Sequence, residues 1–148
     1  MIIFEKRGDI FDTTLQTLVC PCNTIGALGK GLARQFRERY RGLDTPYRRA
    51  CFTGVFRRDG FWVYNAARGD KILCLPTKRH WRDPSKLTYV DQALMAVARD
   101  WEKHGIVSMA MPMVGCGEGG LDWENVYPLI VEHFGRHPVQ VGIFLSPG

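Results

Sequence analysis

The segment Met111–Trp123, which reads MPMVGCGEGGLDW, constrains the fold of this chain more than any other stretch. An apolar run, Ile106–Val114, leads into closely spaced glycines, and a helical pattern follows them. Glycine lets the backbone adopt positive φ and approach a ligand closely, and backbone N–H groups at the start of a helix attract anions. A strand, a glycine loop and a helix in this order therefore predict a phosphate-binding loop. A tight turn without a ligand is the plain structural alternative.

Two common nucleotide-binding classes are excluded by the residues around the glycines. The loop spells G-x-G-x-x-G, but a dinucleotide site also needs an acidic residue about 20 positions further on. The corresponding segment, Pro138–Leu145, contains no acidic residue. A second glycine-rich stretch, Asn23–Gly31, has Thr24 where the P-loop motif requires glycine, and it lacks the required serine or threonine after Lys30. The sequence therefore predicts a phosphate site that belongs to neither class.

Strand-like and helix-like segments alternate along the chain, which predicts one α/β domain over residues 1–148 with a mostly parallel, mixed central sheet. Apolar runs predict strands at Met1–Phe4, Thr17–Cys22, Val55–Tyr64 (with a turn at Asp59-Gly60), Lys71–Leu75, Ile106–Val114 and Val139–Leu145. Helical spacing of apolar residues predicts helices after Gly31, at Asp44–Thr53, at Ser85–His104 and after Asp122, with Asp44 and Asp122 as N-caps.

The charge and the cysteines bound the class of protein. A net charge of +5 and a pI of about 9.1 suit a polyanionic or nucleotide partner, although a solvated basic surface explains the charge equally well. The five cysteines are scattered and their spacing fits no zinc site, so we expect a reduced, cytoplasmic protein without a metal. No apolar run reaches the length of a membrane span, and the charged start MIIFEKRGD is unlike a signal peptide.

Four segments are expected to meet beyond the carboxyl ends of the strands, where the ligands of parallel sheets bind. These segments are Gly8–Asp12, Asn23–Gly31, Pro76–Trp81 and Val114–Leu121. The set suits a ligand with a base at one end, a diphosphate in the middle and a sugar at the other end. Asp9 can accept a hydrogen bond from an amine of the base, the glycine loops can wrap the diphosphate, and Asn23 can hold sugar hydroxyls.

Three stretches carry a resemblance to a known family: NTIGALGKGLARQF, LPTKRHWRDPSKL and MPMVGCGEGGLDWENVYPLI. They resemble the macrodomain family of ADP-ribose-binding proteins, in particular the macrodomains of DarG antitoxins and, more loosely, the terminal ADP-ribose protein glycohydrolases. The resemblance extends from Gly8 to Phe134. It implies a three-layer α/β/α sandwich and an ADP-ribosyl hydrolase, with ADP-ribose as ligand or product and no cofactor.

The resemblance also implies a substrate and partners. DarG macrodomains remove ADP-ribose from a thymine base in single-stranded DNA, which the toxin DarT modifies. The implied partners are therefore ADP-ribosylated single-stranded DNA and a DarT-type toxin, and we expect a monomer that has no contact with a membrane.

The resemblance assigns roles to individual residues. Lys78 matches the essential lysine, Asn23 matches the asparagine at the distal ribose, and Asp9-Ile10 matches the adenine contact. One departure concerns Gly119, which stands where the protein-directed glycohydrolases carry a catalytic aspartate, and this favours DNA as the modified substrate. The remaining ligand-binding residues that we expect are Gly29, Lys30, Gly31, Thr77, Val114, Gly115, Cys116, Gly117, Glu118, Gly119, Gly120 and Leu121.

Two chemical roles are open to Lys78. A neutral amine can attack C1″ of the distal ribose and form a Schiff base, whereas an ammonium group can protonate or stabilise the departing base. His80 is a second candidate for proton transfer, although a surface histidine is the simpler interpretation. Trp81 can stack on a DNA base while Arg79 and Arg82 contact phosphates; the alternative is a tryptophan packed at the domain edge.

Other functions fit the same residues. One is hydrolysis of protein-linked ADP-ribose or of ADP-ribose 1″-phosphate, and another is non-catalytic reading of ADP-ribose marks. The missing aspartate weighs against protein carboxylates as the site of attachment, and Lys78 weighs against a pure reader. Turnover separates these functions, because a reader binds ADP-ribose but releases nothing.

Overall fold

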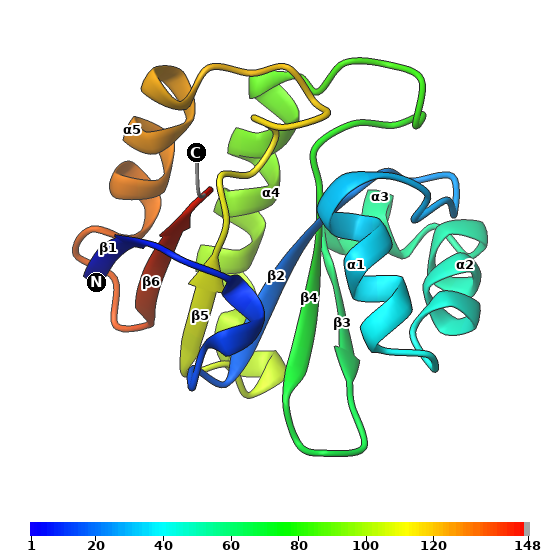
Figure 1. Cartoon of the computed structure of the whole chain (residues 1–148), viewed down its shortest axis with the longest axis horizontal. Helices are drawn as coiled ribbons and strands as arrows, with labels where there is room; N and C mark the ends of the chain where they lie inside the picture. The colour runs from blue at the N-terminus through cyan, green and yellow to red at the C-terminus, as the bar shows by residue number, and fades with distance from the viewer. Residues whose placement is uncertain (147–148) are drawn as a thin grey trace.

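A computed structural model describes residues 1–146 and contains a six-stranded sheet with the order β1-β6-β5-β2-β4-β3 (Figure 1). Neighbouring strands run parallel except for β3, which pairs antiparallel with β4 at one edge. The strands span Ile2–Arg7 (β1), Thr17–Cys22 (β2), Trp62–Asn65 (β3), Lys71–Pro76 (β4), Ser108–Met111 (β5) and Gln140–Leu145 (β6). This mixed, mostly parallel sheet confirms the predicted α/β class.

Helices cover both faces of the sheet, so the domain has the three predicted layers (Figure 1). One layer contains α1 (Gly31–Arg39), α2 (Asp44–Phe52) and α3 (Val55–Asp59), and the other contains α4 (Leu87–Asp100) and α5 (Trp123–Phe134). Two short 3-10 turns, η1 (Ile10–Asp12) and η2 (Trp101–His104), complete the described elements. No helix within residues 1–146 is both long enough and apolar enough to cross a membrane.

The central strands are buried on both sides, which explains their continuous apolar runs. In β2, Val19 packs into the core shared with α4 and α5, whereas Leu18 and Cys20 pack into the core shared with α1, α2 and α3. Cys22 and Cys74 are likewise buried in this second core as free thiols. These cysteines therefore act as small apolar core residues, as cysteine commonly does.

The strand predicted at Val55–Tyr64 is wrong for its first half. Val55–Asp59 forms the short helix α3, and only Trp62–Asn65 pairs with the sheet. Gly54 and Gly60 flank the helix with left-handed φ of 77° and 86°, so both of its ends are turns. Phe56 then packs edge-on against Tyr47 of α2, with ring centroids 6.1 Å apart, instead of entering the sheet.

Other boundaries shift because tertiary contacts decide them. The strand expected at Ile106–Val114 is shortened to Ser108–Met111, the only part that pairs with its neighbours. The helix expected at Ser85–His104 is α4 followed by η2, and Gly105 ends it with φ of 68°, as predicted. Asp44 is the first helical residue and not the N-cap; its carboxylate pairs with Arg48 at 2.6 Å. Asp122 does occupy the N-cap position of α5, but within residues 1–146 its side chain makes no capping bond.

Gly142 of β6 gives a test of how closely the edge strand β1 packs on the sheet. A β-carbon at this position would overlap the ring of Phe4. We expect Gly142→Ala to lower the free energy of unfolding by about 1–3 kcal/mol, measured by urea denaturation, because overpacking forces neighbours to shift. Gly29→Ala, where a β-carbon meets no atom within 4 Å, is the matched control. Adding Phe4→Leu to Gly142→Ala should restore part of the loss; no restoration would contradict the steric cause.

Candidate functional site

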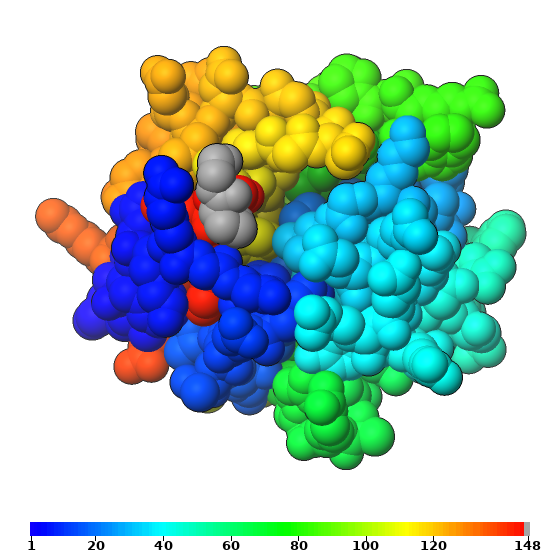
Figure 2. Space-filling view, in the orientation of Figure 1, coloured from blue at the N-terminus to red at the C-terminus, as the bar shows by residue number. Residues whose placement is uncertain are grey.

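A cavity of about 1200 Å³ opens beyond the carboxyl ends of the parallel strands, and all four predicted segments line it. In Figure 2, the recess lies between the yellow glycine loop and the cyan start of α1. Of the predicted site residues, the wall includes Asp9, Ile10, Asn23, Gly29, Lys30, Gly31, Thr77, Lys78, Trp81, Arg82, Gly115, Gly117, Glu118, Gly119 and Gly120. The structure therefore brings together residues from segments that are far apart in the sequence.

Asn23 lies at the end of β2, is only 4% exposed, and organises the loop that follows it. Its Oδ1 accepts hydrogen bonds from the backbone N–H groups of Ile25 and Ala27 at 3.1 and 3.3 Å, while its Nδ2 donates to the Ala27 carbonyl at 2.6 Å. The buried hydroxyl of Tyr47 donates to the Asn23 side chain at 2.9 Å. An amide nitrogen carries two hydrogens, so one N–H of Asn23 is left for a ligand.

Lys78 lies on the cavity wall in a loop that backbone bonds hold at both ends. The N–H of Thr77 donates to the Cys22 carbonyl at 3.0 Å, and the N–H of Lys86 donates to the Thr77 carbonyl at 3.1 Å. Within residues 1–146 no hydrogen bond or ion pair engages the Lys78 side chain. Its amine is therefore free to meet a ligand in the cavity.

Ser85 joins the loop that carries Lys78 to the glycine loop that contains Gly119, a role that nothing in the sequence indicated. Its backbone N–H donates to the Gly119 carbonyl at 2.9 Å, and its buried hydroxyl donates to the Thr77 hydroxyl at 3.1 Å. A β-carbon on Gly119 would overlap the Ser85 hydroxyl and would lie 2.5 Å from the Gly115 carbonyl. This close approach leaves no space for any side chain at position 119.

The two glycine loops also approach each other. Gly31 has φ of 55°, and a β-carbon there would meet the Glu118 side chain at 3.2 Å. Gly115 and Gly120 also have left-handed φ, of 76° and 78°, which the turns of the glycine loop after β5 require. Within residues 1–146 no side chain caps the start of α1, whose first residues line the cavity. An uncapped helix start between two glycine loops is a favourable place for a phosphate.

A cluster of aromatic and basic side chains lies at the cavity mouth. Trp81 is 40% exposed, and Arg82 and Lys30 lie near its ring, with their charged groups 4.7 and 5.9 Å from the centroid. The imidazole of His80 stacks beside the same ring at 5.5 Å, and its Nδ1 accepts the N–H of Arg82 at 3.1 Å. The ring is therefore held in place by neighbours while part of its surface stays open.

Five predicted site residues are not on the cavity wall. Arg79 is exposed and lies over Tyr89 at 5.0 Å, and His80 is turned toward Trp81. In the glycine loop after β5, the side chains of three residues pack into the core or against it instead: Val114, Cys116 and Leu121. Burial, followed by the charge of Asp122, raises the pKa of Cys116 to about 11, so its thiol stays protonated at neutral pH.

Asp9 and Ile10 line the opposite end of the cavity. One carboxylate oxygen of Asp9 accepts the N–H of Phe11 at 2.9 Å and so begins the turn η1. The other oxygen lies 4.0 Å from the Arg39 guanidinium, which leaves it able to accept a further hydrogen bond. Ile10 is buried at 4% exposure and forms an apolar floor there.

Tyr47 offers a test of how Asn23 is held. Burial raises the pKa of Tyr47, so its hydroxyl stays protonated and donates to both oxygens of Asn23. We expect Tyr47→Phe to reduce the free energy of unfolding by about 1–2 kcal/mol, because it leaves buried acceptors without this donor. Tyr127→Phe is the control, since the Tyr127 hydroxyl makes no hydrogen bond within residues 1–146. Equal effects of the two variants in thermal denaturation would argue against the proposed bond.

The comparisons with known proteins agree with this geometry. The DNA ADP-ribosyl glycohydrolase of Mycobacterium tuberculosis is 39% identical over 99% of this chain, which spans 42% of that relative. The corresponding protein of Thermus aquaticus is 34% identical over 85% of this chain and 36% of the relative. The chain therefore spans about two fifths of the length of these curated relatives.

Solved structures show the same relationship. The macrodomain of Mycobacterium tuberculosis DarG superposes with a TM-score of 0.88 and 37% identity, covering 100% of this chain and 98% of that one. Thermosipho africanus DarTG, solved in complex with ADP-ribose, has a TM-score of 0.87 and 30% identity over 93% of this chain and 40% of that one. The Macro domain family matches residues 19–130, which is most of the sequence. The chain belongs to the macrodomain family.

Proposed function

We propose that this macrodomain is a DNA ADP-ribosyl glycohydrolase that removes ADP-ribose from thymine bases of single-stranded DNA. The observation that carries the proposal is the Lys78 side chain, unpaired within residues 1–146, on the wall of a cavity whose glycine loops suit the diphosphate of ADP-ribose. The 39% identity to proteins named DNA ADP-ribosyl glycohydrolases supports it. In this proposal a DarT-type toxin supplies the modified DNA, and residues 1–148 act as one monomeric macrodomain in the cytoplasm.

The proposed pose follows from the chemistry of the cavity wall. Adenine lies on Ile10, with its amine donating to Asp9, because these residues combine an apolar floor with a free acceptor. The diphosphate lies between the glycine loops at the uncapped start of α1. The distal ribose then reaches Asn23 and Lys78, which puts its C1″ atom beside the lysine amine.

Lys78 acts on the bond between C1″ and the thymine nitrogen in either of two ways. In the first, the neutral amine attacks C1″, the base leaves and takes a proton, and water later hydrolyses the resulting Schiff base to ADP-ribose. In the second, the ammonium group stabilises or protonates the departing base while water attacks C1″. Both routes consume one water and release thymidine in DNA and free ADP-ribose.

The geometry of Gly119 supports DNA as the substrate over a protein carboxylate. The protein-directed relatives carry a catalytic aspartate at the matching position, whereas the Ser85 hydroxyl and the Gly115 carbonyl leave no room for a side chain there. In this proposal catalysis therefore depends on Lys78. Trp81 and Arg82 at the mouth offer a stacking surface and a phosphate contact for the strand.

Lys78→Ala tests the proposed catalytic role. We expect loss of at least 100-fold in the release of ADP-ribose from a thymidine-ADP-ribosylated oligonucleotide, a magnitude typical of removing a catalytic acid, base or nucleophile (about 10²–10⁴). Binding of free ADP-ribose, measured by calorimetry, should persist. Lys103→Ala, on an exposed lysine of η2, is the control. Release by Lys78→Ala at the wild-type rate, or no release by the wild type, would refute the proposal.

Borohydride separates the two routes. Reduction during turnover traps a Schiff base as a stable amine, so the first route predicts an adduct of Lys78 that mass spectrometry detects. An active enzyme that yields no adduct would support the second route, in which the lysine stays non-covalent.

Arg82→Glu tests the proposed phosphate contact at the mouth. We expect a KM for the modified oligonucleotide that is raised roughly tenfold at low salt, because each lost phosphate contact weakens binding. Binding of free ADP-ribose should be unchanged. Arg57→Glu, on the exposed face of α3, controls for the change in net charge. Equal losses of oligonucleotide processing and of ADP-ribose binding would contradict this role.

A further inference from the structure

The segment around α1 holds most of the net charge of the chain. Residues 30–41 contain five basic residues and one acidic residue, so the segment carries +4 of the total +5. The basic residues are Lys30, Arg34, Arg37, Arg39 and Arg41, and all are exposed. The solubility of the domain does not by itself account for so many basic residues on and beside one short helix.

Two of these residues share one side of the helix, and two others flank its ends. At 100° per residue, Arg34 and Arg37 lie about 60° apart around the axis. Lys30 is the N-cap residue, with extended φ and ψ of −142° and 159°, and Arg41 follows the C-cap residue Tyr40. We call Lys30, Arg34, Arg37 and Arg41 the basic stripe.

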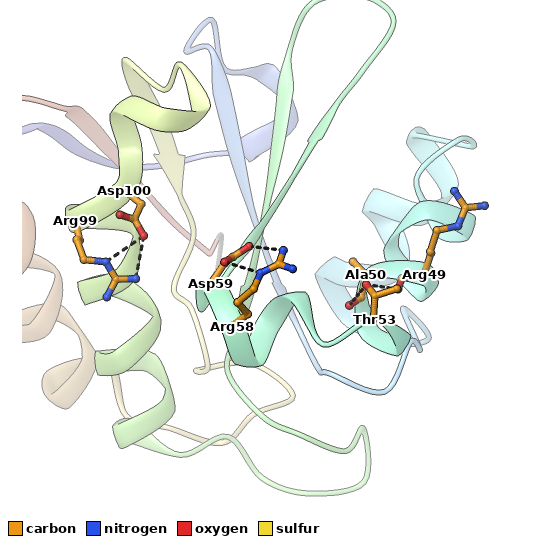
Figure 3. A network of polar contacts seen from close by, with 7 residues as sticks. All are labelled: Arg49, Ala50, Thr53, Arg58, Asp59, Arg99 and Asp100. Atoms are coloured by element: carbon orange, nitrogen blue, oxygen red, sulfur yellow. Dashed lines mark hydrogen bonds and ion pairs between the residues drawn. The ribbon is translucent and has the colours of Figure 1, made fainter.

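Most of the basic stripe differs from those surface arginines that are paired with an acidic neighbour. Arg58 pairs with Asp59 at 3.0 Å and Arg99 pairs with Asp100 at 2.9 Å (Figure 3). In the stripe, only Arg34 has such a partner, the exposed Glu38 at 2.9 Å, and a pair this exposed contributes little and exchanges easily.

Three cations of the stripe, including Lys30, have no ion pair within residues 1–146. The other two are Arg37 and Arg41. The negative end of the helix dipole explains a cation in the last turn, such as Arg37, but not a continuous stripe.

Both ends of the stripe meet features that suit a nucleic acid. At the first end, the Lys30 amine lies 5.9 Å from the ring of Trp81, at the mouth of the cavity. At the other end, which contains Arg41, lies a hollow of about 280 Å³. It is lined by Arg39, Tyr40, Arg41, Gly42, Tyr64, Ala66, Ala67 and Arg68. In Figure 2, the cyan surface of α1 runs from the recess toward the green turn of the β3–β4 hairpin, which contributes Arg68.

We propose that single-stranded DNA leaves the cavity mouth along α1, with its phosphates on the basic stripe and in the hollow at its end. The stripe runs from residue 30 to residue 41, and α1 within it has nine residues, about 14 Å at 1.5 Å each, which matches about four nucleotides of a stacked strand at 3.4 Å each. Continuity with Trp81, on which a base can stack, favours a nucleic acid over an acidic protein. The inference rests on the proposed function, because it takes the target base to enter the cavity.

The test compares two double variants of equal charge change. Arg37→Glu/Arg41→Glu alters the stripe, and Arg49→Glu/Arg57→Glu alters exposed arginines of α2 and α3. Arg49 projects from α2, and its guanidinium makes no hydrogen bond or ion pair within residues 1–146; its carbonyl accepts from the Thr53 hydroxyl at 3.0 Å (Figure 3). Each variant is assayed for binding an unmodified fifteen-nucleotide strand by fluorescence anisotropy over a range of salt concentrations. Each is also assayed for turnover of an ADP-ribosylated fifteen-nucleotide strand and an ADP-ribosylated trinucleotide.

The stripe variant should bind the long strand roughly tenfold more weakly, and the slope of log K against log salt should fall by about 1.4, or 0.7 for each lost phosphate contact. Its turnover of the trinucleotide and its binding of free ADP-ribose should match the wild type, and the control variant should match in all assays. Equal weakening by the control, or equal losses on the long and the short substrate, would overturn the proposal. Stripe-dependent binding by a wild type that releases no ADP-ribose would instead support the stripe and refute the proposed function.

Discussion

The site depends on the parallel pairing of β2 with β4. In this register Cys22 lies opposite Pro76, and the N–H of Thr77 donates to the Cys22 carbonyl at 3.0 Å, one residue beyond the end of the strand. Asn23 and Lys78 therefore leave the sheet side by side at the same edge. A shift of one residue would move every side chain of the strand to the other face of the sheet, so the two buried cores hold this register firmly.

Backbone hydrogen bonds join the loops around Lys78 and Gly119. Thr24 donates its N–H to the Arg79 carbonyl at 3.0 Å, and Ser85 donates its N–H to the Gly119 carbonyl at 2.9 Å. Salt screens charges on an exposed surface far more than it affects such bonds. The shape of the cavity is thus set independently of ionic strength, whereas the basic surfaces at its mouth and along α1 respond to it.

Much of the site was predictable because its signals are local. A glycine loop between a strand and a helix is a pattern of adjacent residues, and so is the segment that carries Lys78. Tertiary contacts that no local pattern encodes produced the differences. Val55 and Phe56 suggest the start of a strand, but the segment Val55–Asp59 forms a helix whose Phe56 packs on Tyr47. The bond from Ser85 to Gly119 joins two segments far apart in the chain, so no local pattern of residues indicates it.

The sequence by itself determined the α/β class and the two glycine loops, because apolar periodicity and glycine spacing act over a few residues, and the family resemblance singled out Lys78. Only the tertiary structure decided which side chains share the cavity. It turned Arg79 toward Tyr89 and packed Val114 into the core. It also left no space for a side chain at Gly119. These outcomes depend on how distant segments pack together, and packing is settled by contacts across the whole fold and not by neighbours along the chain.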